Sequence, residues 1–514
     1  MRKGFFTTIL NWVEKGGNAL PHPATLFGLF AIIVLLLSWI FHLMGTSAVH
    51  PVTLETYHAV NLLSRDGIHR ILDEMVVNFT GFAPLGIVLV AMLGIGIAEG
   101  SGLISALIRL LVLSAPKRIL TFVLVFSGIL SNMASDIGYV LLIPLAGVIF
   151  HSIGRHPIAG MAAAFAGVSG GFSANLFIGT IDPLLAGLSQ EAARIVDDQY
   201  VVNPTANYYF MVVSTFVIAI TGTWVTEKLV VPRLGKYKGD EKPEKIEPLT
   251  GLEKKGLYWA LAVFLILGAI LLAGIIPEHG ILRADDGSIL RSPVLKGFIA
   301  ILLVFSALPS TAYGIVVGKY KNDADVMKGM ADNMKTLATY IVLVFFAAQF
   351  VAYFKWSNLG LIFAIDGAEV LKNSGLGLIP LMLLFIVFAA SINMLMGSAS
   401  AKWALLAPIF IPMFMFLGYT PELSQVVYRI GDSVTNIISP MMSFFALILV
   451  FFEKYDPKAG IGTLISTMFP YSVFFFIAWV ILLIAWVLLG LELGPGAGIH
   501  LDDTLMRDLK PAKQ

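Results

Sequence analysis

Four ionisable residues stand inside apolar stretches of this chain and are the first candidates for chemistry: Asp136, Asp182, Arg429 and Asp432. A charge at the centre of a bilayer costs about 2.5–3.5 kcal/mol on insertion scales, so one that is kept there generally has a function. Arg429 and Asp432 are three residues apart and would share one face of a helix. They could neutralise each other. Alternatively, Arg429 offers its planar guanidinium to a substrate carboxylate, while Asp432 orients it or takes a coupling cation.

Asp182 has two interpretations. It follows a Gly-Thr turn and precedes Pro183, with no basic residue nearby in the sequence. It could hold a cation, a proton or a substrate amine, or it could simply begin a helix, because Asp before Pro is a common helix start. Further along, we expect Lys402 to extend its charge to the membrane interface. Trp403 either stacks on an aromatic ring or packs in an ordinary way.

Segments rich in Gly, Ser and Asn flank these charges in both halves of the chain. Such segments let the backbone leave the helix at membrane depth, which is tolerated only beside protein or a water-filled cavity. Carbonyl, Asn and Asp oxygens are the ligands that a hard cation such as sodium needs, although small residues also serve close helix packing. The candidate ion-coupling residues are Asp136, Asn175, Asp432 and Asn436, with Asp432 and Asn436 as candidate sodium ligands, and Asn393 joins the candidate substrate contacts.

The elements that position these residues are expected to be transmembrane helices. Hydrophobic residues make up 57% of the 514 residues and charged residues 13%, where a soluble domain carries about 25% charged residues. Apolar runs recur along the whole chain, which favours one all-α polytopic membrane domain over residues 1–514. Several runs are shorter than a full span, which is typical of re-entrant or broken helices. The predicted segments are 24–44, 82–97, 119–133, 139–150, 158–168, 208–230, 257–276, 295–317, 339–353, 376–396, 403–417, 423–438 and 471–491.

Four hydrophilic loops set the expected orientation. Residues 231–256 hold seven Lys and Arg, and residues 319–335 hold four lysines. Residues 46–80 and 277–293 hold two Lys or Arg each. The positive-inside rule places the first two loops and the N-terminus in the cytoplasm, and the other two loops outside.

An internal repeat is visible at a shift of 264 residues. Pro144 and Pro157 fall on Pro408 and Pro421, and Gly154 and Gly167 fall on Gly418 and Gly431. Prolines and glycines fix backbone geometry, so matching them is stronger than matching Leu or Phe. We expect repeat 1 to cover about 80–230 and repeat 2 about 336–491, with a weaker echo of Gly102-Leu103-Ile104 at Gly360-Leu361-Ile362.

Several function classes are disfavoured. The chain has no cysteine, no HExxH, no phosphate-binding loop and no GxSxG elbow. Its net charge of +1 implies no attraction to nucleic acid. An intramembrane enzyme would need a catalytic pair, for example Asp182 and Asp432 meeting in space. No cofactor is expected, and a carrier fits the repeats and buried charges better than an enzyme or a passive channel.

The chain resembles the AbgT-type p-aminobenzoyl-glutamate transporter family. The resemblance runs from Asn11-Trp12-Val13-Glu14 almost to Gly494-Pro495-Gly496, and its most specific stretches are residues 78–86, 154–157, 171–176, 403–412 and 429–432. It implies a homodimer in the bacterial inner membrane, with about nine transmembrane helices and two re-entrant helical hairpins in an inverted repeat per protomer. It also implies transport of p-aminobenzoyl-glutamate coupled to sodium or protons, in either direction, and export of sulfonamides by some members.

The resemblance also carries the family's functional residues onto this sequence. The substrate contacts that it implies, taken with Asn393, are Asp182, Ser400, Trp403, Pro421, Arg429 and Pro440, and it adds a functional role for Asp432. An aromatic ring for Trp403 and carboxylates for Arg429 agree with the interpretation of the residues themselves. A different dicarboxylate or aryl carboxylate is the alternative substrate.

Overall fold

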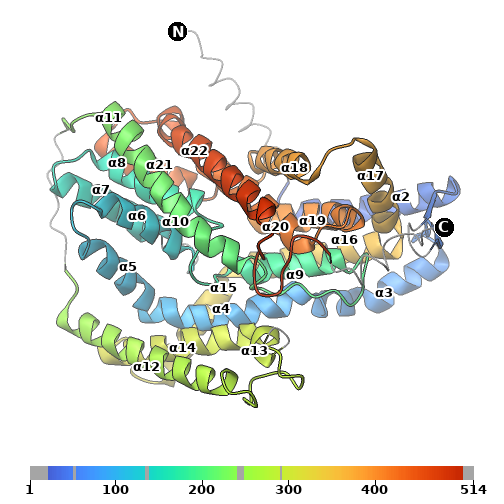
Figure 1. Cartoon of the computed structure of the whole chain (residues 1–514), viewed down its shortest axis with the longest axis horizontal. Coiled ribbons are helices and arrows are strands. Elements are labelled where there is room, and N and C mark those ends of the chain that lie inside the picture. The colour runs from blue at the N-terminus through green and yellow to red at the C-terminus, as the bar shows by residue number, and fades with distance from the viewer. Residues whose placement is uncertain (1–20, 50–53, 134–137, 240–247, 290–291, 502–514) are drawn as a thin grey trace, which may run out of the picture.

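The computed structural model describes residues 21–49, 54–133, 138–239, 248–289 and 292–501, and these parts of the chain are almost wholly helical (Figure 1). Within these ranges, eight helices are long and apolar enough to cross a membrane. The prediction of an all-α polytopic membrane protein is therefore confirmed. The expected number of about nine transmembrane helices stays a prediction.

The elements fall into two halves joined by an arm. An N-terminal part precedes the two halves and consists of α2 (Pro23–Leu43), β1 (Ser47–Val49), β2 (Thr56–His58) and α3 (Arg65–Thr80). Strands β1 and β2 pair in antiparallel orientation. The first half holds α4 (Ala83–Ser101), α5 (Leu103–Leu113), α6 (Leu120–Ser131), η1 (Gly138–Leu142), α7 (Ile143–Ser152), α8 (Pro157–Phe165), η2 (Ala166–Gly170), α9 (Ile181–Ala193), α10 (Tyr208–Val225), η3 (Thr226–Val230) and α11 (Val231–Leu234).

The arm packs along α4 and covers one side of the molecule (Figure 1). It consists of α12 (Gly251–Ile275), α13 (Pro293–Lys296), α14 (Phe298–Val317) and α15 (Asp323–Thr336). The second half holds α16 (Ala338–Trp356), α17 (Leu359–Asn373), α18 (Leu378–Asn393), α19 (Ala399–Phe416), α20 (Pro421–Asn436), α21 (Phe445–Tyr455) and α22 (Ile461–Leu488).

Three of the expected hydrophilic loops contain helices. Residues 46–80 include α3, residues 231–256 include the short α11 and the start of α12, and residues 319–335 include most of α15. The side chain of Asn322 caps α15 by accepting from the backbone N–H of Asp325, which is also an acidic residue in the first turn. An amphipathic helix of this kind is polar enough to resemble a loop in a hydropathy profile, which is why it was missed.

The glycines and prolines that recur in the repeat have the same structural role in both halves. Gly154 and Gly418 each follow the first helix of a helix pair and adopt positive φ, 78° and 90°, a conformation that favours glycine. Pro157 and Pro421 each begin the second helix, where the missing N–H costs nothing. The shift of 264 residues also separates Ile181 and Phe445, which are the first residues of α9 and α21.

A second pair of glycines lets helices approach closely. A Cβ at Gly167 would lie 2.2 Å from the carbonyl oxygen of Val125, and one at Gly431 would lie 2.6 Å from that of Ile386. These positions bring η2 against α6, and α20 against α18. The repeat therefore preserves a close helix crossing in each half.

Irregular backbone separates the short helices and brings the halves together. In the first half α9 follows residues 171–180, and in the second half α21 follows residues 437–444, neither of which is helical. The hydroxyl of Ser439 donates to the carbonyl oxygen of Asn393, which ties the second break to the end of α18. The backbone N–H of Ser173 donates to the hydroxyl of Ser433 at 3.1 Å, which ties the first break to α20.

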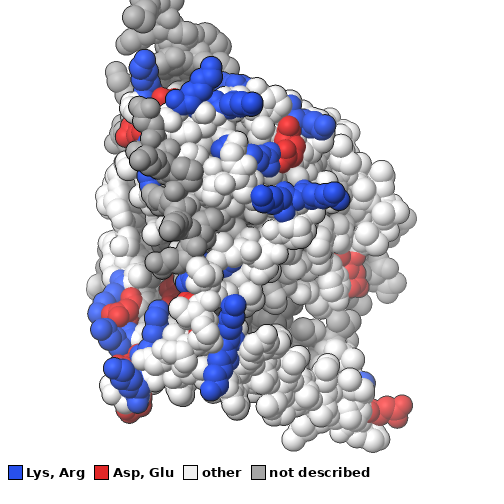
Figure 2. Space-filling view, turned by 90° about the vertical axis from the view of Figure 1, so that its left-hand side faces the viewer, with Lys and Arg blue, Asp and Glu red and all other residues white. Residues whose placement is uncertain are grey.

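Basic side chains gather at one end of the molecule. Figure 2 shows Lys and Arg clustered on the face that forms the left-hand side of Figure 1, where α11 and the start of α12 lie. Arg233, Lys236 and Lys238 are exposed there. Arg109 of α5 forms an ion pair of 2.9 Å with Glu253 at the start of α12. This end is the one to which the positive-inside rule assigns the cytoplasm.

We predict that Gly431→Ala lowers the stability of the purified protein by about 1–3 kcal/mol, because the added methyl group overpacks the crossing of α20 and α18. Gly268→Ala is the matched control, since a Cβ at Gly268 in α12 meets nothing within 4 Å. Thermal unfolding in detergent measures both variants. Equal melting temperatures would contradict the close-packing role of Gly431.

Candidate functional site

A buried ion pair joins the two halves at the start of α9. The guanidinium Nη1 of Arg429 lies 2.7 Å from Oδ1 of Asp182, and both side chains are almost fully inaccessible. The other carboxylate oxygen of Asp182 accepts from the backbone N–H of Gly179 at 2.7 Å. Removing two charges from water is costly, so each group depends on the other for compensation.

The geometry of this pair leaves hydrogen-bonding capacity unused. Nε and Nη1 of Arg429 and Oδ1 of Asp182 have no hydrogen-bond partner among the described residues, although the two groups are in contact. A guanidinium presents five N–H donors in a fork that matches a carboxylate. The arrangement can therefore exchange one carboxylate for another with better aligned hydrogen bonds.

A separate chain of neutral hydrogen bonds links α19, α9 and α20. Trp403 of α19 donates from Nε1 to the hydroxyl of Ser189 at 2.9 Å, and Ser189 donates to Gln425 of α20 at 2.7 Å. The amide of Gln425 donates in turn to the side chain of Asn207 at 2.7 Å. Because each buried polar group is satisfied by the next, this chain fixes the positions of α9, α19 and α20 relative to one another.

The indole of Trp403 stacks on the ring of Tyr428. The ring centroids are 4.5 Å apart, with an interplanar angle of 23°. Tyr428 precedes Arg429 on α20, and both rings are fully buried. Successive residues of α20 therefore carry the aromatic stack and the guanidinium, and these two groups are the chemistry that an aryl carboxylate requires.

A second buried ion pair lies about one helical turn further along α20. The ammonium of Lys402 binds the carboxylate of Asp432 and the side-chain oxygen of Asn393, and all three side chains are buried. Asn436 donates to the remaining carboxylate oxygen of Asp432 at 3.1 Å. We call Lys402, Asp432, Asn393 and Asn436 the lysine cluster.

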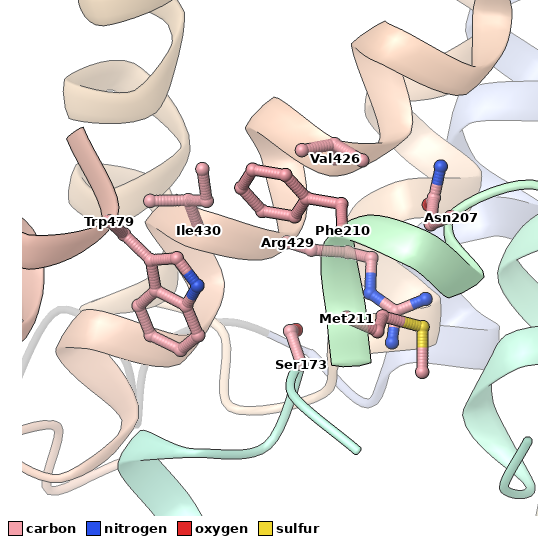
Figure 3. A pocket seen from close by; sticks show the side chains of 8 residues that line it. All are labelled: Ser173, Asn207, Phe210, Met211, Val426, Arg429, Ile430 and Trp479. Atoms are coloured by element: carbon pink, nitrogen blue, oxygen red, sulfur yellow. The ribbon is translucent and has the colours of Figure 1, made fainter. Parts of the chain in front are cut away.

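The space beside Arg429 is small. A cavity of about 10 Å³ lies between α10, α20, α22 and the break after η2. Figure 3 shows the guanidinium of Arg429 beside Asn207 and Met211, with Trp479 across the cavity. Small-molecule sites have volumes of about 300–1,000 Å³, so a substrate reaches Arg429 only after these helices move apart. A cavity of about 650 Å³ between the arm and α4 and α5 has no charged residue in its lining.

The family of this chain follows from its similarity to known proteins. Residues 8–501 match the model of the AbgT putative transporter family. The chain belongs to this family. The match covers both ion pairs and both halves of the repeat, so the site described above is a feature of an AbgT-family member.

Three relatives of this AbgT-family chain are informative. The p-aminobenzoyl-glutamate transport protein of Escherichia coli (strain K12) is 39% identical over 489 residues, which is 95% of this chain and 96% of the relative. The YdaH transporter of Alcanivorax borkumensis has 46% identity and a TM-score of 0.89, covering 92% of this chain and 100% of that structure. MtrF of Neisseria gonorrhoeae, described among antimetabolite efflux pumps, has 52% identity and a TM-score of 0.89, covering 93% and 97%. The chain is accordingly a membrane transporter.

The other predicted site residues have diverse surroundings. Asn175 accepts from the backbone N–H of Phe177, and Ser400 shares a hydrogen bond of 3.2 Å with Ser398 at the start of α19. Pro421 is the first residue of α20, and Pro440 lies in the break before α21. Asp136 lies outside the described residues. The structure thus brings Asp182, Arg429 and Trp403 into one site, and joins Asn393, Asp432 and Asn436 in the lysine cluster.

Two interpretations of the charges were wrong. Arg429 and Asp432 do not form an ion pair with each other, because Arg429 pairs with Asp182 and Asp432 pairs with Lys402. Lys402 does not extend to the interface, since its side chain is fully buried. Charge balance was the available signal: Asp136, Asp182, Arg429 and Asp432 sum to −2, which predicts a further buried cation, and Lys402 is one.

We predict that Arg429→Ala destabilises the protein by about 3–5 kcal/mol, because it leaves Asp182 buried without its counter-charge. The double variant Arg429→Ala, Asp182→Ala should recover a large part of that loss. Chemical unfolding of the single and double variants in detergent measures the coupling. If the two single effects simply add, the residues do not stabilise each other.

Proposed function

We propose that this protein is an ion-coupled secondary transporter of p-aminobenzoyl-glutamate, acting as importer or exporter. Related aryl antimetabolites such as sulfonamides are candidate substrates for export, and another dicarboxylate or aryl carboxylate is the alternative. The observation that carries the proposal is the buried Arg429–Asp182 pair beside the Trp403–Tyr428 stack. The names of the Escherichia coli and Neisseria gonorrhoeae relatives support the substrate class and the export direction respectively.

The ion pair suggests how substrate and ion are coupled. In the proposed cycle a substrate carboxylate takes the unused donors of Arg429 and replaces Asp182 on the guanidinium. Asp182 would then be buried without a positive partner, which is unfavourable unless a proton or a cation neutralises it. Substrate binding is thereby linked to the uptake of a positive charge at Asp182.

The proposed setting is the bacterial inner membrane, with the N-terminus and the basic end of Figure 2 in the cytoplasm. We further propose a homodimer, as the family resemblance implies. The arm supports this assembly, because α12 has extensive exposed apolar surface, including Tyr258, Leu265 and Ile270, which must face lipid or another protein.

The decisive experiment is flux of radiolabelled p-aminobenzoyl-glutamate in proteoliposomes, with sodium and proton gradients imposed separately in each direction. We expect accumulation against the substrate gradient under one of the two ion gradients. No flux under any gradient, with protein that remains folded, would remove this substrate and direct the search to sulfonamides and other aryl acids.

We predict that Arg429→Lys weakens binding of p-aminobenzoyl-glutamate about 10- to 150-fold, because an ammonium loses charged hydrogen bonds worth about 1.5–3 kcal/mol that the planar fork makes. Equilibrium binding to the purified variant measures this effect. The matched control is Arg233→Lys, the same exchange at an exposed residue that binds Ser466 far from the site. Unchanged affinity in Arg429→Lys would rule out the carboxylate-binding role.

We predict that Asp182→Asn uncouples transport from the ion gradient, because an amide needs no neutralising charge when the substrate takes Arg429. Exchange of labelled for unlabelled substrate should persist, whereas accumulation driven by the gradient should disappear. Accumulation that still follows the gradient in this variant would place the coupling site elsewhere.

A further inference from the structure

The lysine cluster contains a buried cation that the proposed substrate contacts do not use. Lys402 is fully buried, and its ammonium binds one oxygen from Asp432 and one from Asn393. A carboxylate oxygen and an amide oxygen are the ligands that a hard monovalent cation takes in a membrane protein. The ammonium thus binds Asp432, one of the two expected sodium ligands, together with Asn393, whereas the other expected ligand, Asn436, donates to the second carboxylate oxygen of Asp432.

The surrounding hydrogen bonds hold both oxygens toward this position. The amide nitrogen of Asn393 donates to the backbone oxygen of Asp432, to the hydroxyl of Thr435 and to the side chain of Asn436, at 2.7, 2.9 and 2.8 Å. These three contacts fix the orientation of the amide, so its oxygen faces Lys402. Asn436 holds the second carboxylate oxygen of Asp432, so the first oxygen also faces inward.

Charge balance explains why this position cannot hold two cations at once. Asp182, Arg429, Lys402 and Asp432 are each at most 3% exposed, and they form two neutral pairs. Adding a cation beside Lys402 would put two positive charges on one buried carboxylate, where little solvent screens their repulsion. An external cation can bind Asp432 only when the ammonium withdraws.

We propose that Lys402 is a tethered cation that competes with an external monovalent cation for Asp432 and Asn393. This inference rests on the proposed ion-coupled transport and specifies how its cation site is controlled.

The position of Lys402 links this competition to the substrate. Lys402 and Trp403 are successive residues of α19: Lys402 binds Asp432 in the lysine cluster, whereas Trp403 donates to Ser189 of α9 and stacks on Tyr428, which precedes Arg429. On α20, likewise, Asp432 belongs to the lysine cluster, whereas Arg429 pairs with Asp182. A shift of α19 against α20 that opens the aromatic stack therefore also pulls the ammonium from Asp432. Thr435, which binds Asn393, also lines a largely apolar cavity of about 420 Å³ between α18, α20 and α22.

The test is binding of radioactive sodium to the purified full-length protein in detergent, with choline chloride keeping the ionic strength constant. We expect Lys402→Met to raise the affinity for sodium by about tenfold or more relative to the wild type. The gain should vanish in the double variant Lys402→Met, Asp432→Asn. Lys402→Arg, which retains a cation, should show no gain.

Lys355→Met is the matched control, because it removes a lysine from an exposed ion pair with Asp198 and should leave sodium affinity unchanged. If Lys402→Met folds poorly, its yield and melting temperature should be rescued by sodium and not by choline. The proposal is overturned if Lys402→Met binds sodium no better than the wild type, if the gain survives Asp432→Asn, or if sodium gives no rescue. Because sodium binding is measured without substrate, these outcomes are separate from failure of p-aminobenzoyl-glutamate transport.

Discussion

The burial of four charges around one helix is the constraint on which the rest of the structure depends. Arg429 and Asp432 of α20 are removed from solvent, and a buried charge without a partner is strongly destabilising. Their partners come from α9 and α19, so both elements must meet α20 at fixed positions. The irregular breaks before α9 and after α20, and the close crossing at Gly431, make this meeting sterically feasible.

In the proposed transport cycle the same pairing makes the site responsive to ligands. An external ligand then replaces one member of each pair: a substrate carboxylate replaces Asp182, and a small cation replaces Lys402. The cavity beside Arg429 is too small for a substrate, so exchange requires movement of the surrounding helices. Since α20 contributes to both pairs, a movement of α20 against α9 and α19 would change both, which is the requirement for thermodynamic coupling between two ligands.

Much of the architecture was predictable because it depends on local rules. Membrane spans follow from the length of apolar runs, and the repeat is visible because Gly154, Gly418, Pro157 and Pro421 serve turns and helix starts that need those residue types. The length of apolar runs did not predict the shorter and the amphipathic helices. Helices α9, α15 and α21 are short or amphipathic, and the first turn of α19, which holds Lys402, was placed outside its segment.

By itself the sequence determined the membrane class, the repeated halves, and the chemical groups available for a site: a guanidinium, carboxylates, an indole and several amides. Only the tertiary structure decided which of these groups meet. In the folded protein Arg429 pairs with Asp182 rather than with Asp432, and Asp432 pairs with Lys402. Trp403 stacks on Tyr428. The physical reason is that helix periodicity specifies neighbours within a few residues, whereas these contacts depend on how separate helices pack together.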